Sequence, residues 1–128
     1  MNTGGKTIVA WYIVFTRASE LRGVMRFLKR DFTHVYAMRK SEGGQFWIIV
    51  DPMFSHLKCT LELVDDYPHP RCYTGSTAII LPVKAFIGTD SRWTLCIFNC
   101  VEVVKALLGI RRFWIWTPYQ LYQYLRRA

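Results

Sequence analysis

Cys100 is the residue whose position in the sequence most clearly suggests chemistry. It follows Asn99, a favoured residue at helix N-termini, at the start of a stretch with helical periodicity. A cysteine in the first turn of a helix lies near unpaired backbone N–H groups and the positive end of the helix dipole, which both favour the nucleophilic thiolate. The same N–H groups can stabilise the oxyanion of a tetrahedral intermediate. We therefore predict that Cys100 is a nucleophile.

A nucleophilic cysteine needs a partner that accepts its proton, and histidine is the usual one. His34 lies in residues 31–40, a strand-like stretch upstream of Cys100. We predict that His34 is this base, with an imidazole nitrogen about 4–5 Å from the Cys100 sulfur.

Asp51 is the expected third member, because a carboxylate can hold the orientation and tautomer of an imidazole. It stands near the end of residues 45–52, a second strand-like stretch, and Gly43-Gly44 predicts a hairpin between the two strands. A two-residue or a four-residue turn centred on Glu42-Gly43 places position 34 opposite position 51. A three-residue turn with a bulge would shift the register and separate them.

Three segments around these residues carry a family resemblance. FNCVEVVKALLGI (98–110), TPYQLYQYL (117–125) and FTHVYAMR (32–39) resemble the circularly permuted branch of the NlpC-type papain-like hydrolases. That branch is similar to lecithin:retinol acyltransferase and to permuted bacterial proteins that resemble cell-wall peptidases. In it the histidine precedes the cysteine, and an Asn-Cys pair opens the nucleophile helix. The resemblance covers roughly residues 30–110, and the final helix adds a little to it. The chain also resembles small bacteriophage-encoded members of the group.

The resemblance implies an α+β fold of the permuted papain-like type, with a small antiparallel sheet packed against helices. It implies Cys100 as nucleophile, His34 as base and Asp51 as the orienting residue. The implied activity is hydrolysis of peptide amide or ester bonds through an acyl-enzyme, with peptidoglycan peptides as the favoured substrate. Val101-Glu102 stands where the acyltransferase has a Glu-His pair, which argues against acyl transfer to a lipid.

A phage-encoded member of this kind would be cytoplasmic or virion-associated, with protein partners in a viral assembly. The alternative function is therefore a non-catalytic structural or binding protein on the same fold, such as a virion component.

Length and composition predict one domain over residues 1–128, since 52% of the residues are hydrophobic and suffice for one packed core. The longest apolar run, residues 7–15, is too short to span a membrane and is no convincing signal peptide. We therefore expect free thiols in a reducing compartment. The formal charge of +8 suits anionic partners, but the basic residues are scattered, so nucleic-acid binding is less favoured.

Two other segments suggest binding. His56-x-x-Cys59 and His69-x-x-Cys72 repeat one spacing, and two histidines with two cysteines can bind zinc. Cys59 lies inside an alternating strand pattern and the ligand order is unlike common zinc ribbons, so we predict no metal and no cofactor. The aromatic and basic stretch at 111–127 could meet a membrane or nucleic acid, but we favour a terminal helix packed on the core.

Periodicity and capping signals predict the remaining elements. They are a strand at 7–15, a helix at 18–30, strands at 57–64 and 77–86, a loop at 65–76, and an extended stretch at 110–116. The second of these strands can break near Pro82. The helix from Asn99 should carry a capping box completed by Glu102 and end before Gly109. Thr117, Pro118 and Gln120 predict the start of a last helix.

Overall fold

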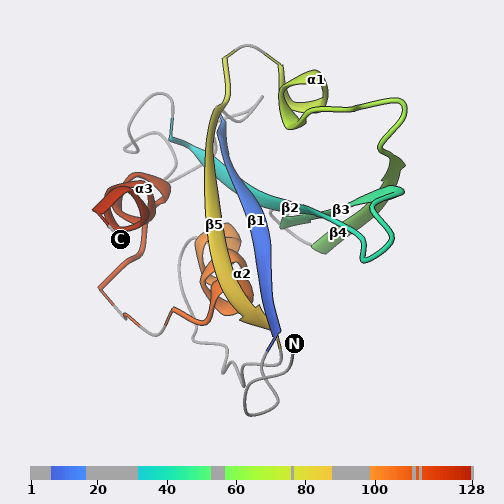
Figure 1. Cartoon of the computed structure of the whole chain (residues 1–128). Helices are drawn as coiled ribbons and strands as arrows, with labels where there is room; N and C mark the ends of the chain where they lie inside the picture. The colour runs from blue at the N-terminus through green and yellow to red at the C-terminus, as the bar shows by residue number, and fades with distance from the viewer. Residues whose placement is uncertain are drawn as a thin grey trace.

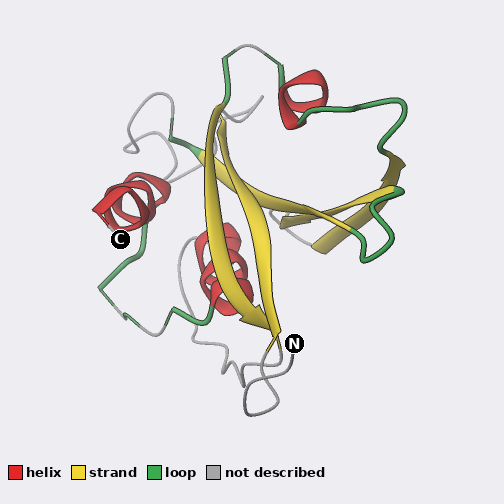
Figure 2. Ribbon diagram, in the orientation of Figure 1, coloured by secondary structure: helices red, strands yellow, loops and turns green. Residues whose placement is uncertain are grey.

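The computed structural model describes residues 7–16, 32–52, 57–75, 77–87, 99–110, 112 and 114–127. In this part of the chain, five strands form one antiparallel sheet and three helices flank it, which is an α+β architecture (Figures 1 and 2). The strands are β1 (Thr7–Thr16), β2 (His34–Lys40), β3 (Phe46–Pro52), β4 (Leu57–Leu63) and β5 (Ile79–Ile87). The helices are α1 (Pro70–Thr74), α2 (Asn99–Leu108) and α3 (Pro118–Arg127).

The strand order is β4-β3-β2-β1-β5, so consecutive strands pair except where the chain returns to place β5 beside β1. β1 and β5 form the long central pair of ribbons in Figure 1, and the paired strands β3 and β4 extend to the right. The start of β2 and the end of β3 meet at one end of the sheet because the two strands are antiparallel.

Each face of the sheet packs in its own core, as alternating apolar side chains require. One face packs against α2 and α3 through Trp11, Ile13, Phe15, Val35, Ala37, Val50, Ala85, Val101, Val103, Val104, Ile115, Leu121 and Leu125. The other lies on the side of α1 and buries Val14, Tyr36, Met38, Trp47, Ile49 and Ala78, with Tyr12, Val64, Tyr67, Tyr73 and Ile80 packed around them. The sheet is thus the middle layer of the described structure.

The hairpin between β2 and β3 has a different register from the expected one. Lys40 pairs with Trp47, and the Ser41 N–H donates to the Phe46 carbonyl, so the loop is residues 42–45. Gly44 adopts a positive φ of 72° in this loop, a conformation that glycine accepts without strain. The expected pairing of positions 34 and 51 is therefore wrong by two residues, and the ladder places position 51 opposite position 36.

Residues 65–76 contain a helix that the loop prediction missed. In α1, Pro70 occupies the first turn and the His69 Nδ1 accepts from the Arg71 N–H at 3.1 Å, which caps the helix. Gly75 follows with a φ of 87°. Histidine is not among the strongly preferred capping residues, so the sequence around His69 only weakly indicates a helix start.

β5 continues through Pro82 without the expected break. Pro82 lies opposite Tyr12 on a strand that pairs only on its β1 side among the described strands. A proline is tolerated on such an edge because its missing N–H can face away from the ladder.

The helices α2 and α3 begin and end close to the residues that the sequence predicts. Gly109 has a φ of 72° and ends α2, with the N–H of Ile110 donating to the Lys105 carbonyl at 2.9 Å, as in a Schellman motif. At the start of α3, the Gln120 N–H donates to Thr117 Oγ1 at 3.2 Å, and Gln120 Oε1 accepts from the Thr117 N–H at 3.1 Å. This is the reciprocal capping box that the sequence predicts.

Several predictions fall outside the described residues, including the helix at 18–30. Over the residues that the structure does describe, none of the helices has the length and apolar character needed to cross a membrane.

Candidate active site

His34 and Asp51 are in direct contact. His34 begins β2, Asp51 lies near the end of β3, and Nε2 of the imidazole is 2.6 Å from Oδ1 of the carboxylate. The two residues are diagonal neighbours, because the register that pairs Ala37 with Val50 sets Asp51 level with Tyr36 rather than with His34 when it is continued by one residue. Their side chains are 19% and 24% exposed, so the pair is partly shielded from water and still open to it.

Cys100 belongs to the same cluster. It is the second residue of α2, half-buried and packed beside the core that α2 shares with the sheet. Its side chain lies close enough to His34 to raise the pKa of the imidazole. The structure therefore brings together the three residues that the sequence singled out, from β2, β3 and the first turn of α2.

These contacts set the charge of His34. Burial alone would lower the pKa of His34, but the hydrogen bond to Asp51 and the electrostatic interactions with Cys100 and Asp51 raise it to about 9. The imidazole is therefore protonated at neutral pH.

The segment before β2 is anchored by aromatic packing. The ring of Phe32 packs on Phe15 of β1 and on Tyr119 and Tyr122 of α3, with centroid separations of 5.7, 5.0 and 4.8 Å. The Thr33 N–H donates to the Thr16 carbonyl at 3.2 Å, which ties the chain to the end of β1. His34 therefore follows two residues that are fixed to the core.

A buried ion pair anchors α2. Lys105 Nζ donates to Glu102 Oε1 and to the Ile115 carbonyl, both at 3.0 Å, and the two charged residues are 4% and 7% exposed. The predicted capping box requires the Glu102 carboxylate to turn back toward the first residue of α2. In the structure this carboxylate instead accepts a hydrogen bond from Lys105, one turn further along the helix. Since Ile115 is fully buried, the pair ties the helix that carries Cys100 to the core.

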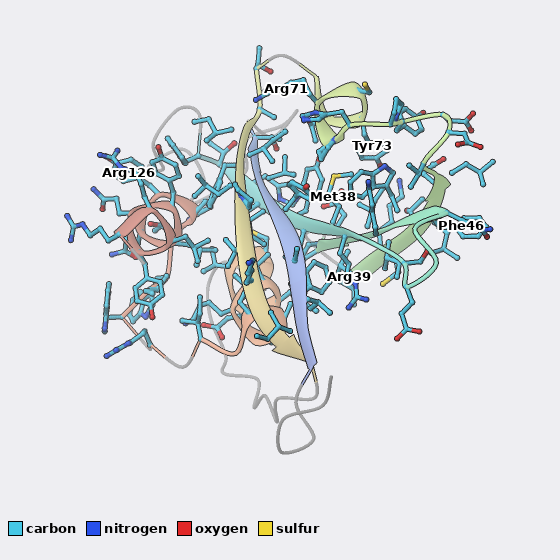
Figure 3. The ribbon with its side chains drawn as sticks, in the orientation of Figure 1. Met38, Arg39, Phe46, Arg71, Tyr73 and Arg126 are labelled. Atoms are coloured by element: carbon cyan, nitrogen blue, oxygen red, sulfur yellow. The ribbon has the colours of Figure 1, made fainter. Side chains whose placement is uncertain are left out.

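Two tyrosines near Asp51 were not predicted. Tyr36 is 8% exposed and its ring centroid is 6.0 Å from that of His34. Burial, then the charges of Tyr73 and Asp51, raises the pKa of Tyr36. Burial and then Asp51 also raise the pKa of Tyr73, the α1 residue labelled in Figure 3. Tyr36 is two residues from His34 on one strand, so strand alternation was the signal that could have found it.

The alternative zinc site is not assembled by the described residues. His69 uses Nδ1 to cap α1, Cys59 lies on β4, and Cys72 lies on α1. His56 is outside the described residues. Within the described ranges, no group of three or more His, Cys, Asp or Glu side chains is placed to hold a metal ion.

Within the C-terminal aromatic and basic stretch, Pro118–Arg127 form α3, the terminal helix that the favoured interpretation predicts. Leu121 and Leu125 are buried against the core, and Tyr122 packs beside them. Arg126 and Arg127 are exposed, and Figure 3 shows Arg126 directed away from the sheet.

Comparisons of the chain with protein-family models, with curated proteins and with solved structures find no match.

Proposed function

We propose that the chain is a cysteine hydrolase in which Cys100 is the nucleophile, His34 transfers protons and Asp51 orients His34. The observation that carries the proposal is the position of His34 between its two partners. An imidazole has two ring nitrogens, so Asp51 on Nε2 leaves Nδ1 for the sulfur of Cys100. Cys100, His34 and Asp51 are then in contact in the order nucleophile, base and orienting carboxylate, as in a catalytic triad.

The chemistry follows from this order. The Cys100 thiolate attacks the carbonyl carbon of an amide or ester, and backbone N–H groups in the first turn of α2 stabilise the resulting oxyanion. The imidazolium of His34 gives its proton to the leaving amine or alkoxide, which produces a thioester on Cys100. Neutral His34 then takes a proton from water, which attacks the thioester, releases the acid and regenerates the thiolate.

The scaffold of this proposal is a permuted papain-like domain. An antiparallel sheet that presents the histidine, and a helix whose first turn presents the cysteine, support it. By the same resemblance we propose peptide or ester substrates, with the peptide stems of peptidoglycan first among them. As part of the same proposal, the enzyme acts in a reducing compartment or as a component of a virion.

A non-catalytic interaction protein on the same scaffold is the second candidate. The observation that favours it is a row of exposed leucines on β4, at positions 57, 61 and 63. Such a row is more typical of a surface that contacts another macromolecule than of an isolated monomer.

The test is one substitution with two readouts. Cys100→Ser should lower kcat/KM by about a thousandfold or more, because serine has no accessible anion near neutral pH. It should leave the melting temperature nearly unchanged, because serine matches cysteine in size and suits a first helical turn. Cys59→Ser on β4 is the matched control and should retain full activity.

The non-catalytic function predicts the opposite pair of results. Wild-type protein would then show no turnover of peptidoglycan peptides, esters or isopeptides. Cys100→Ser would lower the melting temperature, since it would place a hydroxyl in a partly apolar site at a cost of about 1–3 kcal/mol.

A further inference from the structure

β4 is an edge strand with an apolar face. Leu57, Leu61 and Leu63 are 50%, 66% and 46% exposed, and Cys59 between them is also exposed. These four residues alternate along β4 and so share one face of the sheet. Phe46 of β3 lies opposite Leu63 and extends the apolar face. It is labelled at the right of Figure 3. A row of leucines on an edge strand is a template for pairing with another chain.

The opposite edge of the sheet is protected in a way that β4 is not. β5 carries Pro82, which has no N–H, and an exposed Lys84 within its length. Proline and lysine are the residues that block edge pairing. β4 has no proline, and its one lysine, Lys58, is accompanied by Glu62 on the same face.

Backbone groups of β4 face outward at alternate positions. The Val64 N–H donates to the Gln45 carbonyl at 2.9 Å, so it points toward β3. Because N–H direction alternates along an antiparallel strand, positions 57, 59, 61 and 63 direct their N–H and C=O groups away from β3. None of the strands in the described part of the chain pairs with these groups.

We propose that β4 pairs antiparallel with β4 of a second copy, about a two-fold axis at Thr60. In this register Lys58 lies opposite Glu62 of the partner subunit, and Glu62 lies opposite Lys58 of the partner subunit. The outward-facing positions meet as 57 with 63 and 59 with 61, which is the alternation that an antiparallel ladder needs.

This register is singled out by charge. An axis shifted by one residue toward either end pairs Lys58 or Glu62 with Thr60 and leaves the opposite charges apart. Only the axis at Thr60 makes both charge pairs and also aligns all seven residues of β4. Leu57 then lies beside Leu63 of the partner subunit on the apolar face.

The dimer should be reversible. Seven paired residues a side bury less than the area of a permanent interface, so we expect a dissociation constant in the micromolar range. Sedimentation velocity of the full chain, from low micromolar to submillimolar concentration, should show monomer converting to dimer. A monomer throughout that range overturns the proposal.

Charge reversal tests the register. Glu62→Lys places lysine opposite lysine twice, because the two-fold axis repeats the contact, and should weaken the dimer by about tenfold or more. The double variant Glu62→Lys with Lys58→Glu restores both pairs and should recover wild-type affinity. Glu42→Lys, in the β2–β3 loop, makes the same change of net charge away from β4 and should have no effect. A dimer that Glu62→Lys leaves intact, or that the double variant fails to restore, overturns the edge pairing.

Crosslinking gives an independent readout. Position 60 faces itself across the axis in a non-hydrogen-bonded pair, where Cα atoms are about 4.5 Å apart and a disulfide can form. In a background with Cys59→Ser, Cys72→Ser and Cys96→Ser, Thr60→Cys should give a covalent dimer on mild oxidation. Glu62→Cys is the control, because two copies of position 62 lie on opposite sides of the axis. Equal crosslinking at both positions, or none at 60 in a dimeric sample, contradicts the proposal.

Discussion

The imidazole of His34 reaches the carboxylate of Asp51 diagonally across the β2–β3 ladder, with Nε2 2.6 Å from Oδ1. A short contact between a protonated imidazole and a carboxylate is a charge-assisted hydrogen bond, about twice as strong as a neutral one. It fixes the ring plane and the nitrogen that remains for Cys100. In the proposed mechanism, Asp51 is a positioning residue that acts on the chemistry through His34.

Removal of the Asp51 side chain should weaken catalysis less than removal of the imidazole. Asp51→Ala should lower kcat/KM by roughly ten- to a hundredfold, whereas His34→Ala removes proton transfer and should cost about 10² to 10⁴-fold. Asp51→Asn keeps an oxygen for Nε2 but loses the charge, so its activity should lie between Asp51→Ala and wild type. Kinetics on one ester substrate measure all three. Equal losses for Asp51→Ala and His34→Ala would contradict an orienting role.

The same Asp51 variants should shift the pH dependence. The Asp51 hydrogen bond and charge both raise the pKa of His34, so Asp51→Ala should lower it. The alkaline limb of the kcat/KM profile, near pH 9 in wild type, should then move to lower pH. If the alkaline limb of Asp51→Ala stays at the pH of the wild-type limb, the ionisation that it reports belongs to a group other than His34.

Stability should fall with alkaline pH because of His34. The imidazole has a pKa of about 9 in the folded protein and about 6.5 in the unfolded chain. Since the folded pKa is the higher one, the stabilisation is fully present below pH 6.5 and is lost as the pH rises through about 9. The difference corresponds to about 3 kcal/mol of unfolding free energy. Urea denaturation across this pH range measures how the free energy of unfolding changes with pH, and His34→Gln should reduce that slope. An unchanged slope in His34→Gln would refute the assignment.

The buried pair in α2 should be costly to break. Lys105→Met leaves the Glu102 carboxylate buried without its partner and should destabilise the fold by about 3–5 kcal/mol. The double variant Lys105→Met with Glu102→Met removes both charges and should recover much of that loss. Lys84→Met, at an exposed position on β5, is the control and should stay within about 0.5 kcal/mol of wild type. Additive losses in the double variant would mean that the two charges do not interact.

Local signals predicted the described elements best. The capping box of Thr117 and Gln120 and the terminal glycine of α2 are short-range patterns, and the structure forms both. The contact between His34 and Asp51 was predicted even though the register was not. A shift of two residues keeps every side chain on its face, so the two groups stay close enough to touch.

The missed features depend on tertiary context. The capping role of His69 requires its ring to turn back on Arg71, which residue type alone does not favour. The continuity of β5 at Pro82 follows from its place at the sheet edge, and that place depends on where the chain returns. The core that buries Tyr36 includes Tyr73 of α1, a helix that the sequence pattern did not reveal.

The alkylation rate of each cysteine tests the central claim most directly. Cys59 and Cys72 are exposed and Cys100 is half-buried, so access alone would make Cys100 the slowest of the three to react. The proposed function predicts the reverse order near pH 6, where an ordinary thiol reacts slowly, because Cys100 would be activated by the neighbouring His34 imidazolium. Limited treatment with iodoacetamide, read by mass spectrometry of the separate cysteine peptides, should show Cys100 modified at least about tenfold faster than the other two. The advantage should disappear in His34→Ala. If Cys100 reacts no faster than Cys59 and Cys72 in wild-type protein, Cys100 is not an activated nucleophile and the proposed function is wrong.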